Sequence, residues 1–293
     1  MHRLPLLLSG MIAWLFLIAP AQADTVWPRT VSSADGVPIA YEVSGSGEPT
    51  LVFIHGWSCD GRYWRAQVPH FSENHRIITI DLAGHGHSGL QREDYSMTAF
   101  GEDVRAVVED VDAEQVILIG HSMGGAVSLA AAALMPDRVL GLVGVDTFQD
   151  FTQSPSPEEI EVWVGPLRAD FVAAAAPFVA SMFVEATDAA LRDWVIADMT
   201  AAPPEVAISA MENLLGFSGI DKALDTLGQL EVPVIAINAD LWPTNIEGNR
   251  KRLPSFEAVI MPGTDHFLHM AEPQAFNAEL ARVLAEIMAA TDD

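Results

Sequence analysis

The sequence predicts an α/β protein built around a mostly parallel, eight-stranded sheet that is covered by helices on both faces. Short, continuous apolar runs, which are typical of strands buried on both sides, alternate with segments that place apolar residues at helical spacing. Clusters of Gly, Asp, Ser and Pro separate these segments. The chain has 293 residues, of which 50% are hydrophobic, and is therefore long enough for one large domain with an insertion.

Two strand-like runs separated by SADG come first, and six short apolar runs follow. The strands are expected at 25–31, 37–43, 50–56, 76–81, 115–120, 138–146, 232–240 and 256–263. Helices are expected over 97–111, over 126–135 and over 273–289, the second of them ended by Pro136. Right-handed crossovers place the carboxyl ends of parallel strands at one edge of the sheet, where ligand sites of such sheets lie.

Residues 150–227 interrupt this alternation, because they contain several helical segments and no strand-like run. We expect them to form a helical cap inserted over the edge of the sheet, with 24–149 and 228–293 forming the core domain. Residues 1–23 have a basic start, an apolar run and a small-x-small site, which predicts a secretory signal peptide cleaved near Ala23. The mature protein would then be exported, periplasmic or secreted, without a stable membrane anchor; the alternative is an uncleaved anchor.

The net charge argues against nucleic acid and anionic lipid as partners, and the cysteine content excludes a disulfide within the chain. The formal net charge is −25, and such a surface repels nucleic acid and anionic lipid. Cys59 is the only cysteine, so no disulfide can form within the chain. We expect Cys59 to be a small buried residue rather than a nucleophile.

The stretch GHSMGG at 120–125 follows a buried strand and opens a helix, which is the context of a nucleophile elbow. Glycines at 120 and 124 allow a tight turn and a close approach of strand and helix. Ser122 is therefore the predicted nucleophile. The Met123 N–H at the start of the helix is one predicted oxyanion donor, and the Trp57 N–H in the HGW loop is the other.

A general base is expected from a histidine in the loop after the last strand, where GTDHFLHM offers His266. His269 is expected to be packed or exposed, and His121 to point away from the site. His85 and His87 have the spacing H-x-H, but a glycine-rich loop is favoured there over a metal site.

The acid that orients the histidine has two candidates. Asp240 follows the strand VPVIAINAD and lies between Ser122 and His266 in chain order, so it is the predicted third member. Asp146 is the rival, because the strand before it ends at the same edge. Asp81 is expected to organise its own turn.

The motifs HGW, DLAGHGHSG, GHSMGG and GTDHFLHMAEP, in this order, resemble the α/β-hydrolase superfamily of serine hydrolases over about residues 30–290. The resemblance implies Ser122 as nucleophile, His266 as base, and Trp57 and Met123 as oxyanion donors. It also implies no cofactor and no metal. In many relatives a Gly-x-x-Asp-Pro loop supplies the acid, whereas here Trp242 occupies that place.

These features together predict an exported serine hydrolase that cleaves small to medium apolar carboxylic esters or lactones through an acyl-enzyme on Ser122. Apolar side chains of the cap segment could line its acyl pocket. The alternatives are carbon–carbon bond hydrolysis, perhydrolase or haloperoxidase-like chemistry, amidase activity, or a ligand-binding protein without catalysis.

Overall fold

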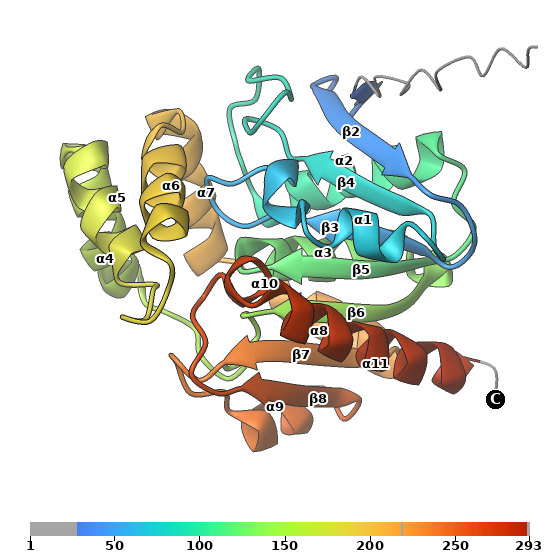
Figure 1. Cartoon of the computed structure of the whole chain (residues 1–293). Helices are drawn as coiled ribbons and strands as arrows, with labels where there is room; N and C mark the ends of the chain where they lie inside the picture. The colour runs from blue at the N-terminus through green and yellow to red at the C-terminus, as the bar shows by residue number, and fades with distance from the viewer. Residues whose placement is uncertain (1–27, 218, 292–293) are drawn as a thin grey trace, which may run out of the picture.

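A single sheet of eight strands forms the centre of the computed structural model, which describes residues 28–217 and 219–291 (Figure 1). The strand order is β1-β2-β4-β3-β5-β6-β7-β8. β2 is antiparallel to both neighbours, and β3 to β8 are parallel, so the predicted mostly parallel sheet is confirmed. The strands are β1 (Arg29–Ser32), β2 (Pro38–Ser44), β3 (Thr50–Ile54), β4 (Ile77–Asp81), β5 (Val116–His121), β6 (Val139–Val145), β7 (Val234–Ala239) and β8 (Phe256–Met261). The predicted signal peptide lies outside the described residues.

Helices cover both faces of the sheet, which explains the continuous apolar runs of its strands. In β5, Val116 and Leu118 belong to one buried cluster, and Ile117 and Ile119 belong to the other, because alternate residues of a strand point to opposite faces. The first cluster includes side chains of α2 (Met97–Asp110), α3 (Met123–Leu134) and α8 (Ile220–Gln229). The second includes side chains of η1 (Gly61–Trp64), α1 (Val68–Phe71), α10 (Leu268–Ala271) and α11 (Pro273–Thr291). The short η2 (Pro136–Arg138) precedes β6, and α9 (Ile246–Arg252) contacts β8.

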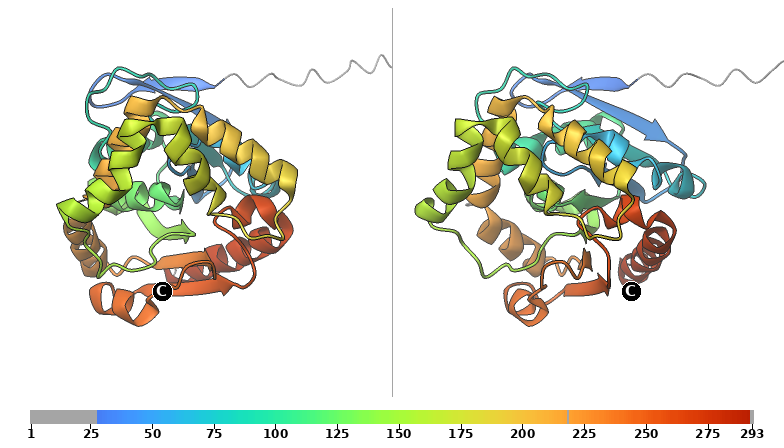
Figure 2. Two further views of the ribbon diagram at one scale, coloured as in Figure 1. Left: turned by 90° about the vertical axis from the view of Figure 1, so that its left-hand side faces the viewer. Right: turned by 60° about the vertical axis from the view of Figure 1, so that its left-hand side comes forward.

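Four helices lie beyond the carboxyl ends of the parallel strands, at the left of Figure 1 and toward the viewer in Figure 2. They are α4 (Pro157–Ala169), α5 (Phe171–Ala180), α6 (Ala189–Thr200) and α7 (Pro204–Leu215), and we call them the cap helices. Helix α8, which begins inside the segment 150–227, contacts α3 and so lies in the layer that covers the sheet.

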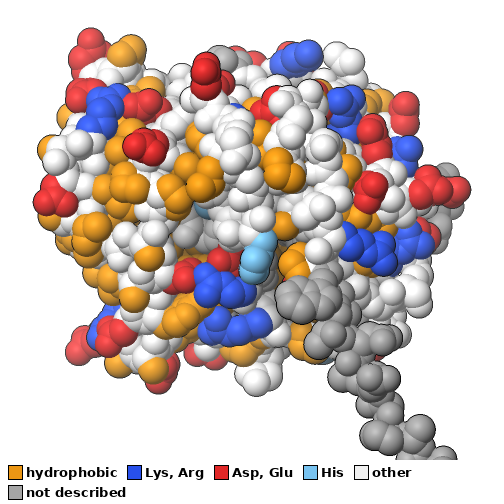
Figure 3. All heavy atoms as spheres, turned by 90° about the horizontal axis from the view of Figure 1, so that it is seen from above, with side chains coloured by type: hydrophobic (Ala, Val, Ile, Leu, Met, Phe, Trp, Pro, Cys, Tyr) orange, Lys and Arg blue, Asp and Glu red, His pale blue; other side chains and the backbone are white. Residues whose placement is uncertain are grey.

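Charges of both signs occur on the surface. On the face seen in Figure 3, acidic and basic side chains are interspersed with apolar ones. Along residues 28–217 and 219–291, none of the helices combines the length and the hydropathy needed to cross a bilayer.

A buried ion pair holds the loop after β4 against α2. Arg92 donates to both carboxylate oxygens of Asp103, at 2.6 and 3.0 Å, and the two side chains are 4% and 0% exposed. The same carboxylate accepts hydrogen bonds from the Ser33 hydroxyl and from the Ala83 N–H. Asp103 therefore connects the start of the sheet, helix α2 and the loop after β4.

Replacing Arg92 with Gln is expected to lower the free energy of unfolding by about 3–5 kcal/mol, because Asp103 would stay buried without its cation. Urea unfolding followed by circular dichroism measures the change. The matched control is Arg282→Gln, which breaks half-exposed pairs with Glu279 and Glu286 on α11 and should cost about 0–1 kcal/mol. Equal losses in the two variants would contradict the structural role of the Arg92–Asp103 pair.

Candidate active site

Ser122 lies at a sharp turn between β5 and α3. Its backbone has φ 52° and ψ −118°, a conformation that residues other than glycine rarely adopt. Two backbone hydrogen bonds fix the turn: the Ser122 N–H donates to the Val145 carbonyl at 3.0 Å, and the Gly125 N–H donates to the Ser122 carbonyl at 2.9 Å. The surrounding structure thus holds the serine in a strained position, as is common at functional sites.

The glycines of the motif are required by close backbone contacts. A Cβ atom at Gly120 would lie 2.2 Å from the Gly124 carbonyl oxygen, and one at Gly124 would lie 2.4 Å from the Ile54 carbonyl oxygen. Both distances are far below van der Waals contact. The pattern G-x-S-x-G therefore requires glycine at these two positions, because β3, β5 and α3 approach one another closely around Ser122.

His266 is paired with Asp146. The His266 Nδ1–H donates to the Asp146 Oδ2 at 2.5 Å, and both side chains are buried. A carboxylate can only accept, so Nδ1 carries the proton and the Nε2 lone pair is left free. The second carboxylate oxygen accepts from the Ala239 N–H at 2.9 Å, and the Asp146 N–H donates to the Ile237 carbonyl at 3.0 Å.

The prediction that Asp240 orients the histidine is wrong in this geometry. Asp240 is exposed, and its Oδ1 accepts from the Gly263 N–H at 2.8 Å. The backbone of Asp146, with φ 44°, turns its carboxylate toward His266 at the end of the neighbouring strand. The loop after β7 contacts the histidine with an aromatic ring and not with a carboxylate. The Trp242 indole lies edge-on to the His266 imidazole, with ring centroids 5.3 Å apart.

The segment between α5 and α6 contacts the histidine loop directly. The His266 N–H donates to the Met182 carbonyl at 3.1 Å, and the Thr187 hydroxyl donates to the Asp265 carboxylate. No local pattern indicates these contacts, because the two segments are far apart in the chain. They mean that residues next to the cap helices help to position the histidine.

The two predicted oxyanion donors lie next to Ser122. Met123 is the first residue of α3, so its N–H has no partner within the helix and lies at the positive end of the helix dipole. The loop containing Trp57 passes close by, since a Cβ atom at Gly56 would lie 3.2 Å from the Ser122 Cβ. Their role as oxyanion donors stays a prediction.

Ser122 and His266 line one cavity of about 200 Å³ beneath the cap helices. In the described part of the chain no hydrogen bond joins their side chains, which is common in enzymes without bound substrate. The rest of the lining is almost wholly apolar and consists of Trp57, Cys59, His121, Trp163, Phe178, Met182, Met199, Met211, Leu214, Leu215 and Phe267. The cavity suits an uncharged, apolar ligand.

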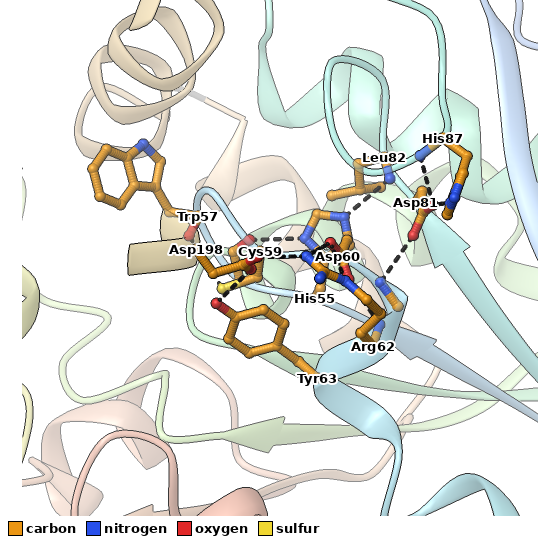
Figure 4. A network of polar contacts seen from close by, with 12 residues as sticks. His55, Trp57, Cys59, Asp60, Arg62, Tyr63, Asp81, Leu82, His87 and Asp198 are labelled. Carbon is orange, nitrogen blue, oxygen red and sulfur yellow. Dashed lines mark hydrogen bonds and ion pairs between the residues drawn. The ribbon is translucent and has the colours of Figure 1, made fainter. Parts of the chain in front are cut away.

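A polar network connects the cap helices to the core beside this cavity (Figure 4). Arg62 pairs with both Asp60 and Asp198, at 2.6 Å in each case, and the Tyr63 hydroxyl donates to Asp198 at 3.1 Å. Asp198 belongs to α6, so these bonds fix that helix on η1. The Trp57 indole N–H donates to the Ala207 carbonyl of α7 at 2.7 Å, which fixes a second cap helix.

Cys59 is a buried thiol, as expected. Burial raises its pKa well above the ordinary value, and its Sγ–H donates to the Trp57 carbonyl at 3.3 Å. The thiol therefore stays protonated and is no rival to Ser122 as nucleophile.

Several other histidines near the site are buried and neutral. Burial lowers the pKa of His121 well below its ordinary value, and it lowers the pKa of both His85 and His269 to about 3. The expectation that His121 points away from the site is wrong, since His121 lines the cavity. Its Nε2 donates to the His266 carbonyl at 2.9 Å, so it supports the backbone of the loop that carries His266. Within residues 28–217 and 219–291, no group of three or more His, Cys, Asp or Glu side chains is arranged to hold a metal ion.

The pairing of His266 predicts a proton resonance far downfield of the backbone amides, because Nδ1–H donates to a carboxylate over a short distance. One-dimensional proton NMR should lose this resonance in Asp146→Asn and keep it in Asp240→Asn. The reverse result would restore Asp240 as the partner of the histidine.

Comparisons with known proteins agree with this geometry. The family described as "alpha/beta hydrolase fold" matches residues 49–185, which include the HGW loop and the Ser122 turn. Over most of its length the chain is similar to the pimeloyl-[acyl-carrier protein] methyl ester esterase of Aeromonas hydrophila. The two are 28% identical over 253 residues, which are 81% of this chain and 96% of the relative.

Solved structures share the fold over nearly the whole chain. An esterase from Thermogutta terrifontis superposes with a TM-score of 0.76 at 22% identity, covering 89% of this chain and 99% of its own. A bromoperoxidase from Bacillus anthracis superposes with a TM-score of 0.74 at 22% identity, covering 88% of this chain and 100% of its own. The turn at Ser122, the order of the strands and these likenesses lead to one conclusion: the chain has the α/β-hydrolase fold.

Proposed function

We propose that the protein is an exported serine hydrolase that cleaves small to medium apolar carboxylic esters or lactones. One observation supports this most strongly: Ser122 and His266 line the same apolar cavity, and Asp146 holds the histidine from behind. Nucleophile, base and orienting acid thus occur together next to space for a small organic substrate.

In the proposed reaction, His266 Nε2 takes the proton of the Ser122 hydroxyl as its oxygen attacks the ester carbonyl. Asp146 stabilises the imidazolium that forms. The backbone N–H groups of Met123 and Trp57 would bind the oxyanion. His266 then gives its proton to the leaving alcohol, and a water molecule activated by the same histidine hydrolyses the acyl-enzyme.

The character of the cavity supports an ester of modest size. Its lining offers many carbon and sulfur atoms and no Asp, Glu, Lys or Arg side chain. The Aeromonas hydrophila relative acts, by its name, on a methyl ester, which agrees with a neutral ester as substrate. An apolar, covered cavity favours substrates whose acyl and alcohol parts are hydrocarbon.

Covalent labelling tests the proposal. A fluorophosphonate should modify Ser122, identified by mass spectrometry of the digested protein, and Ser122→Ala should abolish the adduct. Asp146→Asn should slow labelling by about 10⁴-fold because it favours the wrong histidine tautomer, whereas Asp240→Asn should label at the original rate. A folded protein that takes up no label at Ser122 would refute the hydrolase mechanism.

Export is the second part of the proposal and has its own test. When the full chain is expressed in a bacterium, protein recovered from the periplasm or the medium should begin at Asp24, because signal peptidase cuts after a small-x-small site. Mass spectrometry of the amino-terminal peptide measures this. Protein that stays in the cytoplasm and keeps Met1 would contradict export.

A further inference from the structure

A second apolar cavity lies within the cap helices, next to the reaction cavity. It measures about 170 Å³ and is lined by Val162, Trp163, Pro166, Leu167, Ala174, Phe178 and Met211. None of these side chains is charged. Three of them, Trp163, Phe178 and Met211, also line the cavity that contains Ser122 and His266. The two cavities therefore share one wall, made of side chains from α4, α5 and α7.

This wall consists of side chains that can move. The rings of Trp163 and Phe178 meet edge to face with centroids 5.7 Å apart, and Met211 has a flexible, unbranched side chain. Trp163 is 55% exposed. More than half of the Trp163 side chain is thus free of packing, and a change of its rotamer would join the two cavities.

The reaction cavity alone is small for an organic ligand, and a connection to the second cavity would enlarge it. Its volume of about 200 Å³ is below the range of about 300–1,000 Å³ that is typical of pockets for small organic ligands. Together with the second cavity, the space comes within that range. Val162, which lines the second cavity and not the reaction cavity, is 73% exposed, so a chain that passes Val162 would reach the surface.

We propose that the second cavity is a subsite for the distal methylenes of a linear hydrocarbon chain on the substrate. The inference rests on the proposed ester hydrolysis and extends its substrate class to esters with a longer chain. The chain starts at the ester bound beside Ser122, crosses the shared wall where Trp163 has changed rotamer, and ends between α4 and α5. It can belong to the acid or to the alcohol, since the cavity recognises only hydrocarbon.

Filling the second cavity tests the proposal. Ala174 lines that cavity and not the reaction cavity, so Ala174→Phe should fill it without adding atoms near Ser122. The measured quantity is the ratio of kcat/KM for p-nitrophenyl laurate to kcat/KM for p-nitrophenyl butyrate. We expect this ratio to fall at least about tenfold, because several methylenes lose an apolar site. A second series, with acetate esters of butanol and dodecanol, shows whether the acid or the alcohol chain enters.

The matched control is Ala173→Phe, which places the same ring one residue earlier on α5, where the side chain is exposed and lines neither cavity. It should leave the ratio unchanged. Trp163→Ala removes part of the shared wall and should raise the ratio, which gives a test that does not depend on how Ala174→Phe folds. Unchanged ratios in Ala174→Phe and Trp163→Ala, in both ester series, would overturn the proposal. Absence of hydrolysis with every ester, together with absence of labelling at Ser122, would instead refute the proposed function itself.

Discussion

The hydrogen bond from His266 to Asp146 determines what the rest of the site can do. Asp146 stands at the end of β6 and is bound to β7 twice, through its own N–H to the Ile237 carbonyl and through its carboxylate to the Ala239 N–H. Its other carboxylate oxygen, Oδ2, accepts from the His266 imidazole. The sheet therefore fixes the acid, and the acid fixes the tautomer of the base. Only in that tautomer does Nε2 have a lone pair for the proton of Ser122.

The cap helices contribute to the site in two different ways. Their side chains form most of the apolar cavity, and their backbone and flanking segments bind the loops that the chemistry needs. The Met182 carbonyl accepts from the His266 N–H, while the Ala207 carbonyl accepts from the Trp57 indole. The loops that carry His266 and Trp57 are thus positioned by the same layer that lines much of the cavity. Changes in the cap helices are expected to alter kcat as well as KM.

Local patterns in the sequence were sufficient for the sheet, for the turn at Ser122 and for His266, because each depends on a strand followed by a short loop. The acid could not be chosen in this way. Asp146 and Asp240 both follow buried parallel strands at the same edge, and what separates them is tertiary: a positive φ at Asp146 and an amide at Gly263 that binds Asp240. The sequence likewise does not show which apolar side chains of the cap helices line the cavity. Phe171 packs on Trp57 and Trp194 packs on Tyr63, and neither Phe171 nor Trp194 belongs to the lining.

Two buried, neutral histidines next to His266 would allow its imidazole to become positively charged. The rings of His121 and His269 lie 4.6 Å apart, and the ring of His121 lies 4.6 Å from that of His266. Burial lowers the pKa of both His121 and His269, so both stay uncharged in the proposed transfer of the serine proton to His266. A charged neighbour at that distance would oppose the imidazolium. The rings around His266 are neutral, so the positive charge that would form on its imidazole interacts mainly with the Asp146 carboxylate. This attraction would stabilise the transfer of the proton to His266.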